Sequence, residues 1–252
     1  MSHHSNHAAE HTPEAIRRRL AEGASQGFLK DFIYGAIDGA VTTFAIVSSV
    51  AGAGLSSGIV IILGLANLFA DGFSMASGNF LGTRAENQST TKARREEEEE
   101  IERHPEGERE EIRQIYAAKG FEGGVLEEIV RTITADKERW LDTMMQAEHG
   151  VASDRPSAIK AAVTTFFAFL LIGGIPLIAY LVDLYDPTVF GNPFWPACIL
   201  TGIAFFAVGA VKSRFVDQHW ILGGLEILGV GALAAGMAYT IGLLLRPLAE
   251  GL

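Results

Sequence analysis

Three things are scarce in this 252-residue sequence: cysteine, basic charge, and charged residues within its longest apolar runs. Cys198 is the only cysteine, so no disulfide can form within the chain and a small disulfide-stapled fold is excluded. Lys and Arg total 20 against 30 Asp and Glu, a net charge of −10. Binding to phosphates needs clustered basic side chains, so we expect no nucleic-acid partner. Residues 1–30 lack a continuous apolar core, so we expect no cleaved secretory signal.

Long apolar runs are what the sequence has instead. A helix needs about 20 apolar residues to cross a bilayer, and five runs approach or exceed that length. They cover residues 32–53, 58–82, 161–182, 194–211 and 220–245. The sequence therefore predicts an all-α integral membrane protein with five transmembrane helices.

The basic residues indicate which way these helices run. Nineteen of the 20 lie before the first run, between the second and third, or between the fourth and fifth, and only Arg246 follows the fifth. Short cytoplasmic segments are enriched in Lys and Arg. We therefore expect a multi-pass protein with a cytoplasmic N-terminus and the C-terminus outside. No targeting segment is recognisable, which favours a prokaryotic cell membrane.

Residues 84–156 differ in composition from the rest, with 19 acidic and 12 basic side chains. Pro105 with Gly107, and then residues 121–124, interrupt the helical pattern and predict three helices, the third over 125–149. The expected organisation is a cytoplasmic tail (1–30), two membrane helices (31–83), a cytoplasmic three-helix domain (84–156) and three membrane helices (157–252).

Acidic residues crowd this inserted domain, ten of them within the 16 residues from 96 to 111. Carboxylates that project from neighbouring helices at three- or four-residue spacing can hold divalent metals, and a thioether ligand favours transition metals. The alternative is a solvated acidic face, because pairs such as Glu96 and Glu99 have the same spacing. By spacing alone the solvated face is the favoured interpretation, and the candidate ligands, should a metal site exist, are Glu97, Glu100, Glu108, Glu111, Met144, Met145 and Glu148, with His104 and His149 as accessories. A His-rich tail (His3, His4, His7 and His11) is typical of unstructured chain.

Polar residues also occur inside the predicted spans, where ionisable groups are costly and usually functional. Asp38, Asp71 and Glu226 are the acids. The second span places further polar groups at four-residue steps, which form a stripe of Asn67, Asp71, Met75 and Asn79. Such a stripe either holds helices together by hydrogen bonds or lines a cation path. We favour the path for Asp38, Asp71 and Met75.

Four features together resemble the vacuolar iron transporter family. They are IDGAVTTFAIV in the first span, DGFSMASGNFLG in the second, the Glu-rich three-helix insert, and TMMQAE in the third insert helix. The resemblance covers about residues 31–245. It implies a homodimer that exports Fe²⁺, with Mn²⁺ as a second substrate, in exchange for protons, along a path between the two subunits.

The resemblance also implies roles for individual residues. Asp38 and Met75 correspond to the family's path-lining positions, and the seven insert residues named above correspond to its metal ligands. The chain departs from the family at Asn67, where relatives carry an acid, and in lacking a Pro after the first-span Asp-Gly. Asn67 can bind a cation but cannot release a proton at neutral pH. Asp71, one turn away, is the candidate proton carrier.

We therefore expect a transporter that exports Fe²⁺ from the cytoplasm, with no prosthetic group. The rival interpretation is a membrane-anchored iron buffer or sensor, in which the spans only hold the insert. Buried acids such as Asp38 argue against it, because an anchor gains nothing from them. An enzyme of ferroxidase type is not expected, because no Glu-x-x-His pair is present and Glu100 and His104 are four apart.

Overall fold

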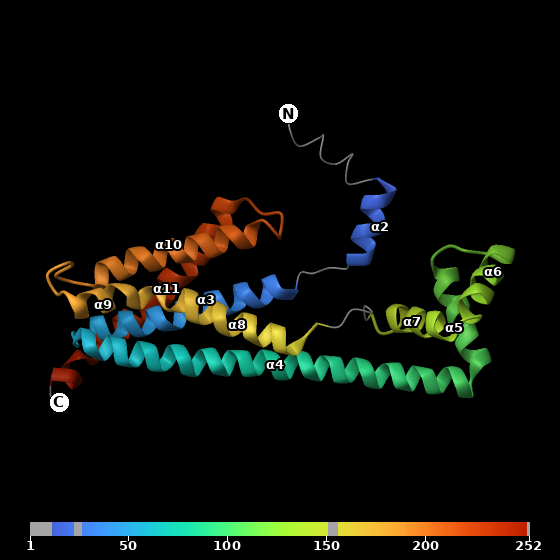
Figure 1. The fold of residues 1–252 in the computed structure, drawn as a ribbon, viewed down its shortest axis with the longest axis horizontal. Helices are drawn as coiled ribbons and strands as arrows, with labels where there is room; N and C mark the ends of the chain where they lie inside the picture. The colour runs from blue at the N-terminus through green and yellow to red at the C-terminus, as the bar shows by residue number, and fades with distance from the viewer. Residues whose placement is uncertain (1–11, 23–26, 151–155, 251–252) are drawn as a thin grey trace. The chain divides into compact units, whose positions relative to one another are not determined.

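The structure is a computed structural model that describes residues 12–22, 27–150 and 156–250. Within these ranges all regular structure is helical (Figure 1). The helices are α2 (Pro13–Glu22), α3 (Gly27–Gly52), α4 (Ser57–Arg103), α5 (Pro105–Ala118), α6 (Gly123–Thr134), α7 (Lys137–Ala147), α8 (Ala158–Gly173), α9 (Ile175–Tyr185), α10 (Phe194–Ser213) and α11 (Trp220–Glu250). They form two compact units, described separately below.

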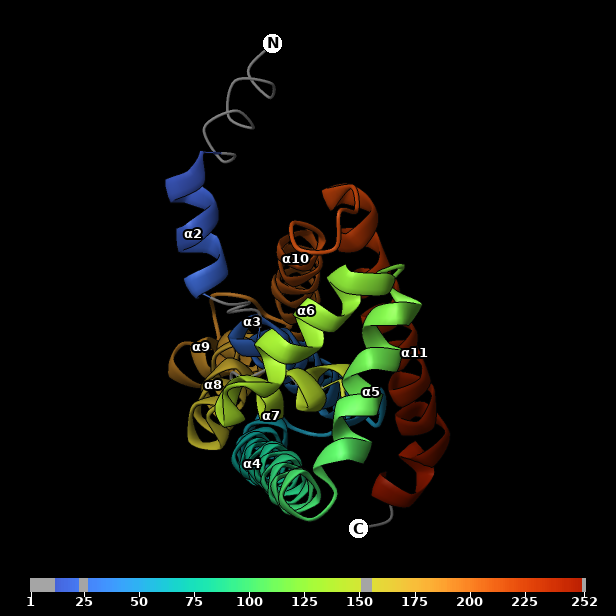
Figure 2. The same cartoon turned by 90° about the vertical axis from the view of Figure 1, so that its right-hand side faces the viewer.

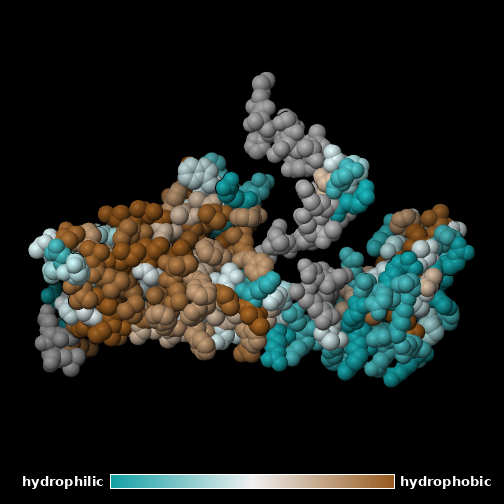
Figure 3. Space-filling model, viewed as in Figure 1, coloured by the Kyte–Doolittle hydropathy of each residue, from teal (hydrophilic) through white to brown (hydrophobic). Residues whose placement is uncertain are grey.

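The first unit comprises Met1–Leu81 and Ala158–Leu252. Four of its helices are long and apolar enough to span a membrane, and α8 with α9 adds a fifth span if the bent pair is counted as one. Apolar side chains cover the face of this unit seen in Figure 3. Phe73 and Leu244, for example, are 70% and 72% exposed. Such a surface suits lipid rather than water, so the chain is an integral, multi-pass membrane protein.

The third predicted span, 161–182, is not one straight helix as expected. It is broken into α8 and α9, which meet at a 47° bend. Pro176 lies in the first turn of α9 and has no N–H with which to continue the hydrogen-bond ladder of α8. The helix therefore ends at Gly173 and restarts at Ile175.

Close backbone contact joins α3 to α8. A β-carbon built on Gly35 would lie 2.4 Å from the carbonyl oxygen of Thr165, and one on Gly39 would lie 2.6 Å from that of Phe169. Only glycine permits such an approach, as at small-residue interfaces of other membrane helices. The buried side chains of Phe169, Leu177 and Phe205 then fill the core of the unit.

Helix α4 is longer than the sequence predicted. The second span was expected to end at residue 82, but the helix continues without a break to Arg103, 47 residues in all. Residues 83–103 contain neither Pro nor Gly and are rich in the helix formers Ala, Glu and Arg. The first helix of the insert is therefore the second half of α4.

The second unit, Gly82–Ser157, contains the segment predicted as the inserted domain. Figure 2 looks onto its helices α5 and α6. Its buried core includes Ile112, Val130 and Leu141. The predicted third helix, 125–149, is instead two helices, α6 and α7. Asp136 separates them by capping α7, where its carboxylate accepts a hydrogen bond from the Arg139 N–H at 2.8 Å.

Candidate functional site

Two buried carboxyl groups meet in the second unit. Glu97 on α4 is 2% exposed and Glu108 on α5 is 5% exposed, and their side chains are hydrogen-bonded to each other. Among the residues that the structure describes, Oε1 of Glu97 and Oε2 of Glu108 have no hydrogen-bond partner. Burying acceptor atoms in this way is costly unless a proton or a cation satisfies them.

The same burial changes the acidity of both groups. Removal from water, followed by the hydrogen bond and the charge of Glu108, raises the pKa of Glu97 to about 8. Burial also raises the pKa of Glu108, although its hydrogen bond with Glu97 acts in the opposite direction. Burial therefore favours the protonated form of the pair.

Three further acids surround this pair. Glu100 follows on α4, Glu111 on α5, and Glu148 caps the C-terminal end of α7, all three exposed. Their negative charges raise the pKa of Glu108, and burial together with Glu148 and Glu100 raises the pKa of Glu111. The structure thus brings the five sequence-predicted glutamates together from three helices, in one cluster of negative charge.

The two predicted thioether ligands lie deeper. Met144 is fully buried and Met145 is 4% exposed, and both belong to the apolar core of the second unit. Helix α7 links them to the acids, because the Glu148 N–H donates to the Met144 carbonyl at 2.8 Å. Their sulfur atoms therefore have a packing role, and their role as ligands stays a prediction.

His149 is a more central residue than its place as an accessory in the sequence suggested. Its Nε2 lies 3.8 Å from Oε2 of Glu97, and ligand atoms of Glu97, Glu148 and His149 lie within 4.8 Å of one another. The signal in the sequence was its position directly after Glu148. His104, the other accessory, is the N-cap residue of α5 and its side chain makes no capping bond.

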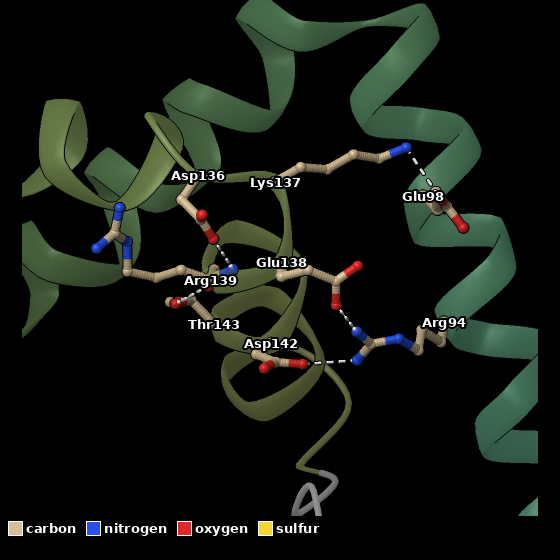
Figure 4. Close-up of polar contacts among 8 residues, drawn as sticks. All are labelled: Arg94, Glu98, Asp136, Lys137, Glu138, Arg139, Asp142 and Thr143. Atoms are coloured by element: carbon tan, nitrogen blue, oxygen red, sulfur yellow. Dashed lines mark hydrogen bonds and ion pairs between the residues drawn. The ribbon is translucent and has the colours of Figure 1, made fainter.

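Ion pairs hold the N-terminal half of α7 against α4 (Figure 4). Arg94 on α4 binds Glu138 and Asp142 of α7, each at 2.6 Å. Lys137 on α7 binds Glu98 at 2.7 Å and Glu102 at 2.6 Å. These contacts fix α7, which carries Met144 and Met145 and leads into Glu148, alongside the helix that carries Glu97.

In the first unit, Asp38 on α3 and Asp71 on α4 are both half-buried and close enough for their charges to interact. Neither forms an ion pair with a basic side chain among the described residues. Asn67 has a buried Nδ2 with no hydrogen-bond partner in that part of the chain, and Met75 packs at the edge of the core. The two acids therefore lie within electrostatic range of each other.

Asn79, the fourth member of the predicted polar stripe, does something else. Its Nδ2 donates to Oδ1 of Asp31 at 2.9 Å and to Oγ1 of Thr165 at 2.8 Å. These bonds tie α4 to α3 and α8. For Asn79 the helix-linking interpretation fits best.

Glu226 also has a structural partner that the sequence did not reveal. Lys212 near the end of α10 reaches it at 3.0 Å. The two residues are 14 positions apart on different helices, so only the packing of α10 on α11 shows that they pair. Asp38 and Asp71 thus remain the span acids without a basic partner among the described residues.

Comparison with known proteins points in one direction. A sequence model of the VIT family matches residues 29–243. The vacuolar iron transporter of Plasmodium berghei (strain Anka) is 32% identical over 224 residues, which cover 86% of this chain and 82% of that protein. Vacuolar iron transporter 1 of Arabidopsis thaliana is 30% identical over 216 residues, 84% of each chain. Vacuolar iron transporter 1 of rice (Oryza sativa subsp. japonica) is 29% identical over 235 residues, 93% and 89% of the two chains.

Proposed function

We propose a direction and a mechanism of transport from the premise that this chain belongs to the VIT family. Its relatives are named as iron transporters, so it is a membrane protein of iron transport and not an enzyme. In our proposal it exports Fe²⁺ from the cytoplasm in exchange for protons, with Mn²⁺ as a second substrate. The second unit is the cytoplasmic domain that captures the metal.

The observation that carries the capture step is the buried pair Glu97 and Glu108. Two carboxyl groups removed from water, each with an unpartnered oxygen among the described residues, are stabilised by a divalent cation that replaces their shared proton. Glu100, Glu111 and Glu148 add the charge that attracts the cation. The buried sulfur atoms of Met144 and Met145 favour transition metals over Mg²⁺ and Ca²⁺.

The membrane path is proposed to pass Asp38, Met75, Asn67 and Asp71. Two neighbouring acids without a basic partner in the described chain require a cation or a proton to neutralise them inside a bilayer. Because both acids are only half-buried within one chain, we propose that a second copy completes the path in a homodimer. The concentration of basic residues on one side supports a cytoplasmic N-terminus and second unit.

Uptake into proteoliposomes tests the proposal. Purified protein is reconstituted, vesicles are made acidic inside, and entry of Fe²⁺ added outside is followed under anaerobic conditions. We expect Fe²⁺ to accumulate only when the pH gradient is present. Asp38→Asn is expected to abolish uptake, whereas Asp186→Asn, an acid in the loop between α9 and α10, serves as the matched control and is expected to transport normally.

The same assay separates the rival function. A membrane-anchored buffer or sensor would bind Fe²⁺ at the second unit but accumulate none inside, with or without the gradient. Equal uptake with and without the gradient would leave transport standing but overturn antiport.

Asp71 is the proposed proton carrier, because Asn67 cannot carry a proton and lies one helical turn away. Asp71→Asn is expected to keep binding of Fe²⁺ at the second unit but to lose pH-driven uptake. Intact pH-driven uptake in this variant would show that another group carries the proton.

A further inference from the structure

We propose that His149 is a metal ligand, and that its Nε2 joins the carboxylates of Glu97 and Glu148 in a three-point site at the C-terminal end of α7. In this site the imidazole gives Fe²⁺ and similar transition metals an advantage over Mg²⁺ and Ca²⁺. The inference rests on the proposed capture of metal by the second unit and deepens it, because it assigns selectivity to one residue.

The geometry brings three ligand atoms from two segments into reach of one ion. Ligand atoms of Glu97, Glu148 and His149 lie within 4.8 Å of one another, and Nε2 of His149 is 3.8 Å from Oε2 of Glu97. Transition metals bind nitrogen and carboxylate oxygen at about 2.0–2.2 Å, so ligand atoms on opposite sides of an ion are at most ~4.4 Å apart. Small rotations of the two exposed side chains therefore close the site.

Glu97 is the buried ligand of the site. It is 2% exposed, and its Oε1 has no hydrogen-bond partner among the described residues. A buried, unpartnered carboxylate oxygen indicates that a positively charged group belongs beside it. The exposed Glu148 and His149 then form the solvent side, through which a cation enters and releases its water.

His149 directly follows the C-cap residue of α7. Glu148 is the C-cap residue, and its N–H still donates to Met144. Gly150 has φ +65°, a left-handed conformation that glycine adopts without strain and other residues rarely do. The helix therefore ends directly before the two exposed ligands.

An imidazole changes the chemistry of a site that otherwise offers carboxylates and thioethers. Carboxylate oxygens suit Mg²⁺, Ca²⁺ and Mn²⁺, whereas imidazole nitrogen suits Fe²⁺, Co²⁺ and Zn²⁺. A neutral imidazole adds no charge, so it contributes little to binding of Mg²⁺. Loss of His149 should therefore lower selectivity, and not only affinity.

A simpler role for His149 makes the opposite prediction. If the protonated imidazole only forms an ion pair with Glu97, it competes with the metal for that carboxylate. Its removal would then leave the affinity for metal unchanged or raise it. A ligand and a competitor are distinguished by the sign of this effect.

The test uses Co²⁺ as the probe and the full-length protein purified in detergent. We compare the unmodified protein with His149→Gln and with His219→Gln, a control histidine in the loop between α10 and α11. His149→Gln is expected to weaken Co²⁺ binding about 10-fold or more and to leave the affinity for Mg²⁺ unchanged, so that Mg²⁺ competes more effectively against Co²⁺. It should also remove a hyperfine-shifted, solvent-exchangeable imidazole N–H resonance from the NMR spectrum of the Co²⁺-loaded protein. His219→Gln should change neither readout.

A third variant, Glu97→Gln, separates the two levels of the proposal. If it weakens Co²⁺ binding but His149→Gln does not, capture by the second unit stands and the role of His149 is overturned. If neither variant weakens binding, capture at this cluster fails, and the role of His149 fails with it. Circular dichroism checks that the exposed substitution at His149 leaves the helices intact.

Discussion

Glu97 on α4 and Glu108 on α5 share a hydrogen bond between two carboxyl groups that water scarcely reaches. One of them must hold a proton for that bond to form. We therefore expect a rise in pH to destabilise the second unit in the absence of metal, and a bound metal ion to stabilise it.

The first prediction concerns pH in metal-free protein. The pKa of Glu97 rises from its ordinary 4.5 to about 8 in the folded unit, so between these values the folded state binds more protons than the unfolded state. The stabilisation is complete below pH 4.5 and is lost as pH rises through 8. Each pKa unit corresponds to about 1.4 kcal/mol. We expect the unit to unfold in less urea at pH 8.5 than at pH 6.

Fluorescence of Trp140, which is buried in this unit, reports the unfolding when Trp195 and Trp220 are replaced by Phe. Glu97→Gln keeps the shape of the side chain and cannot ionise, so it should flatten the pH dependence. Saturating Mn²⁺ should reverse the trend, because metal binds the ionised carboxylates. A pH-independent midpoint in the metal-free protein would contradict the buried proton.

The second prediction separates packing from ligation at Met144. Met144→Leu conserves volume in the core, so the free energy of unfolding should fall by less than about 1.5 kcal/mol. The same change removes a sulfur ligand, and affinity for Co²⁺ should fall while affinity for Mg²⁺ does not. Isothermal titration with the two ions provides the measurement. If Met144 serves packing alone, both affinities will stay unchanged.

The third prediction concerns the ion pairs that hold α7 against α4. Arg94→Gln removes two of them, but both are partly exposed and such pairs contribute about 0.2–1 kcal/mol each. The unit should lose less than about 2 kcal/mol of stability. Binding of Co²⁺ should weaken more clearly at high salt than at low salt, because only the ion pairs of Lys137 then join α7 to α4 and salt screens them. Arg139→Gln, which changes an arginine of α7 outside these ion pairs, is the control and should bind as before.

The fourth prediction addresses Lys212 and Glu226. Lys212→Met leaves an unpaired carboxylate on a membrane helix and should lower the unfolding midpoint, and Glu226→Met leaves an unpaired ammonium and should do the same. The double variant removes both charges and should recover much of the loss. Thermal unfolding in detergent gives the three midpoints. A double variant less stable than both single variants would show that the pair has another role.

Much of the helical membrane fold could be predicted from the sequence, because the length of an apolar run follows directly from the thickness of the bilayer. The break at Pro176 was missed because the apolar run continues through it. The full length of α4 was missed because the drop in hydropathy at residue 82 predicts the end of the helix there. Residues 83–103 contain no helix-breaking residue, so the helix continues.

The sequence could propose candidate residues for the site, but it could not show which of them are buried or lie together. Spacing offered Glu97 with Glu100 and Glu108 with Glu111, and the family resemblance selected them, but spacing alone could not exclude equivalent pairs such as Glu96 with Glu99 without knowing which face α5 covers. Burial now distinguishes them, because Glu96 is exposed and pairs with Lys92. His149 and the partner of Glu226 depend on contacts between distant segments, which local spacing does not reveal.

The glycine contacts between α3 and α8 have a consequence for motion. At Gly35 and Gly39 the two backbones leave no room for a β-carbon, so a larger residue at either position would force α3 and α8 apart. Asp38 directly precedes Gly39 and lies within this close contact. We therefore expect α3 and α8 to move together during transport, and any shift between states to occur along other helix boundaries.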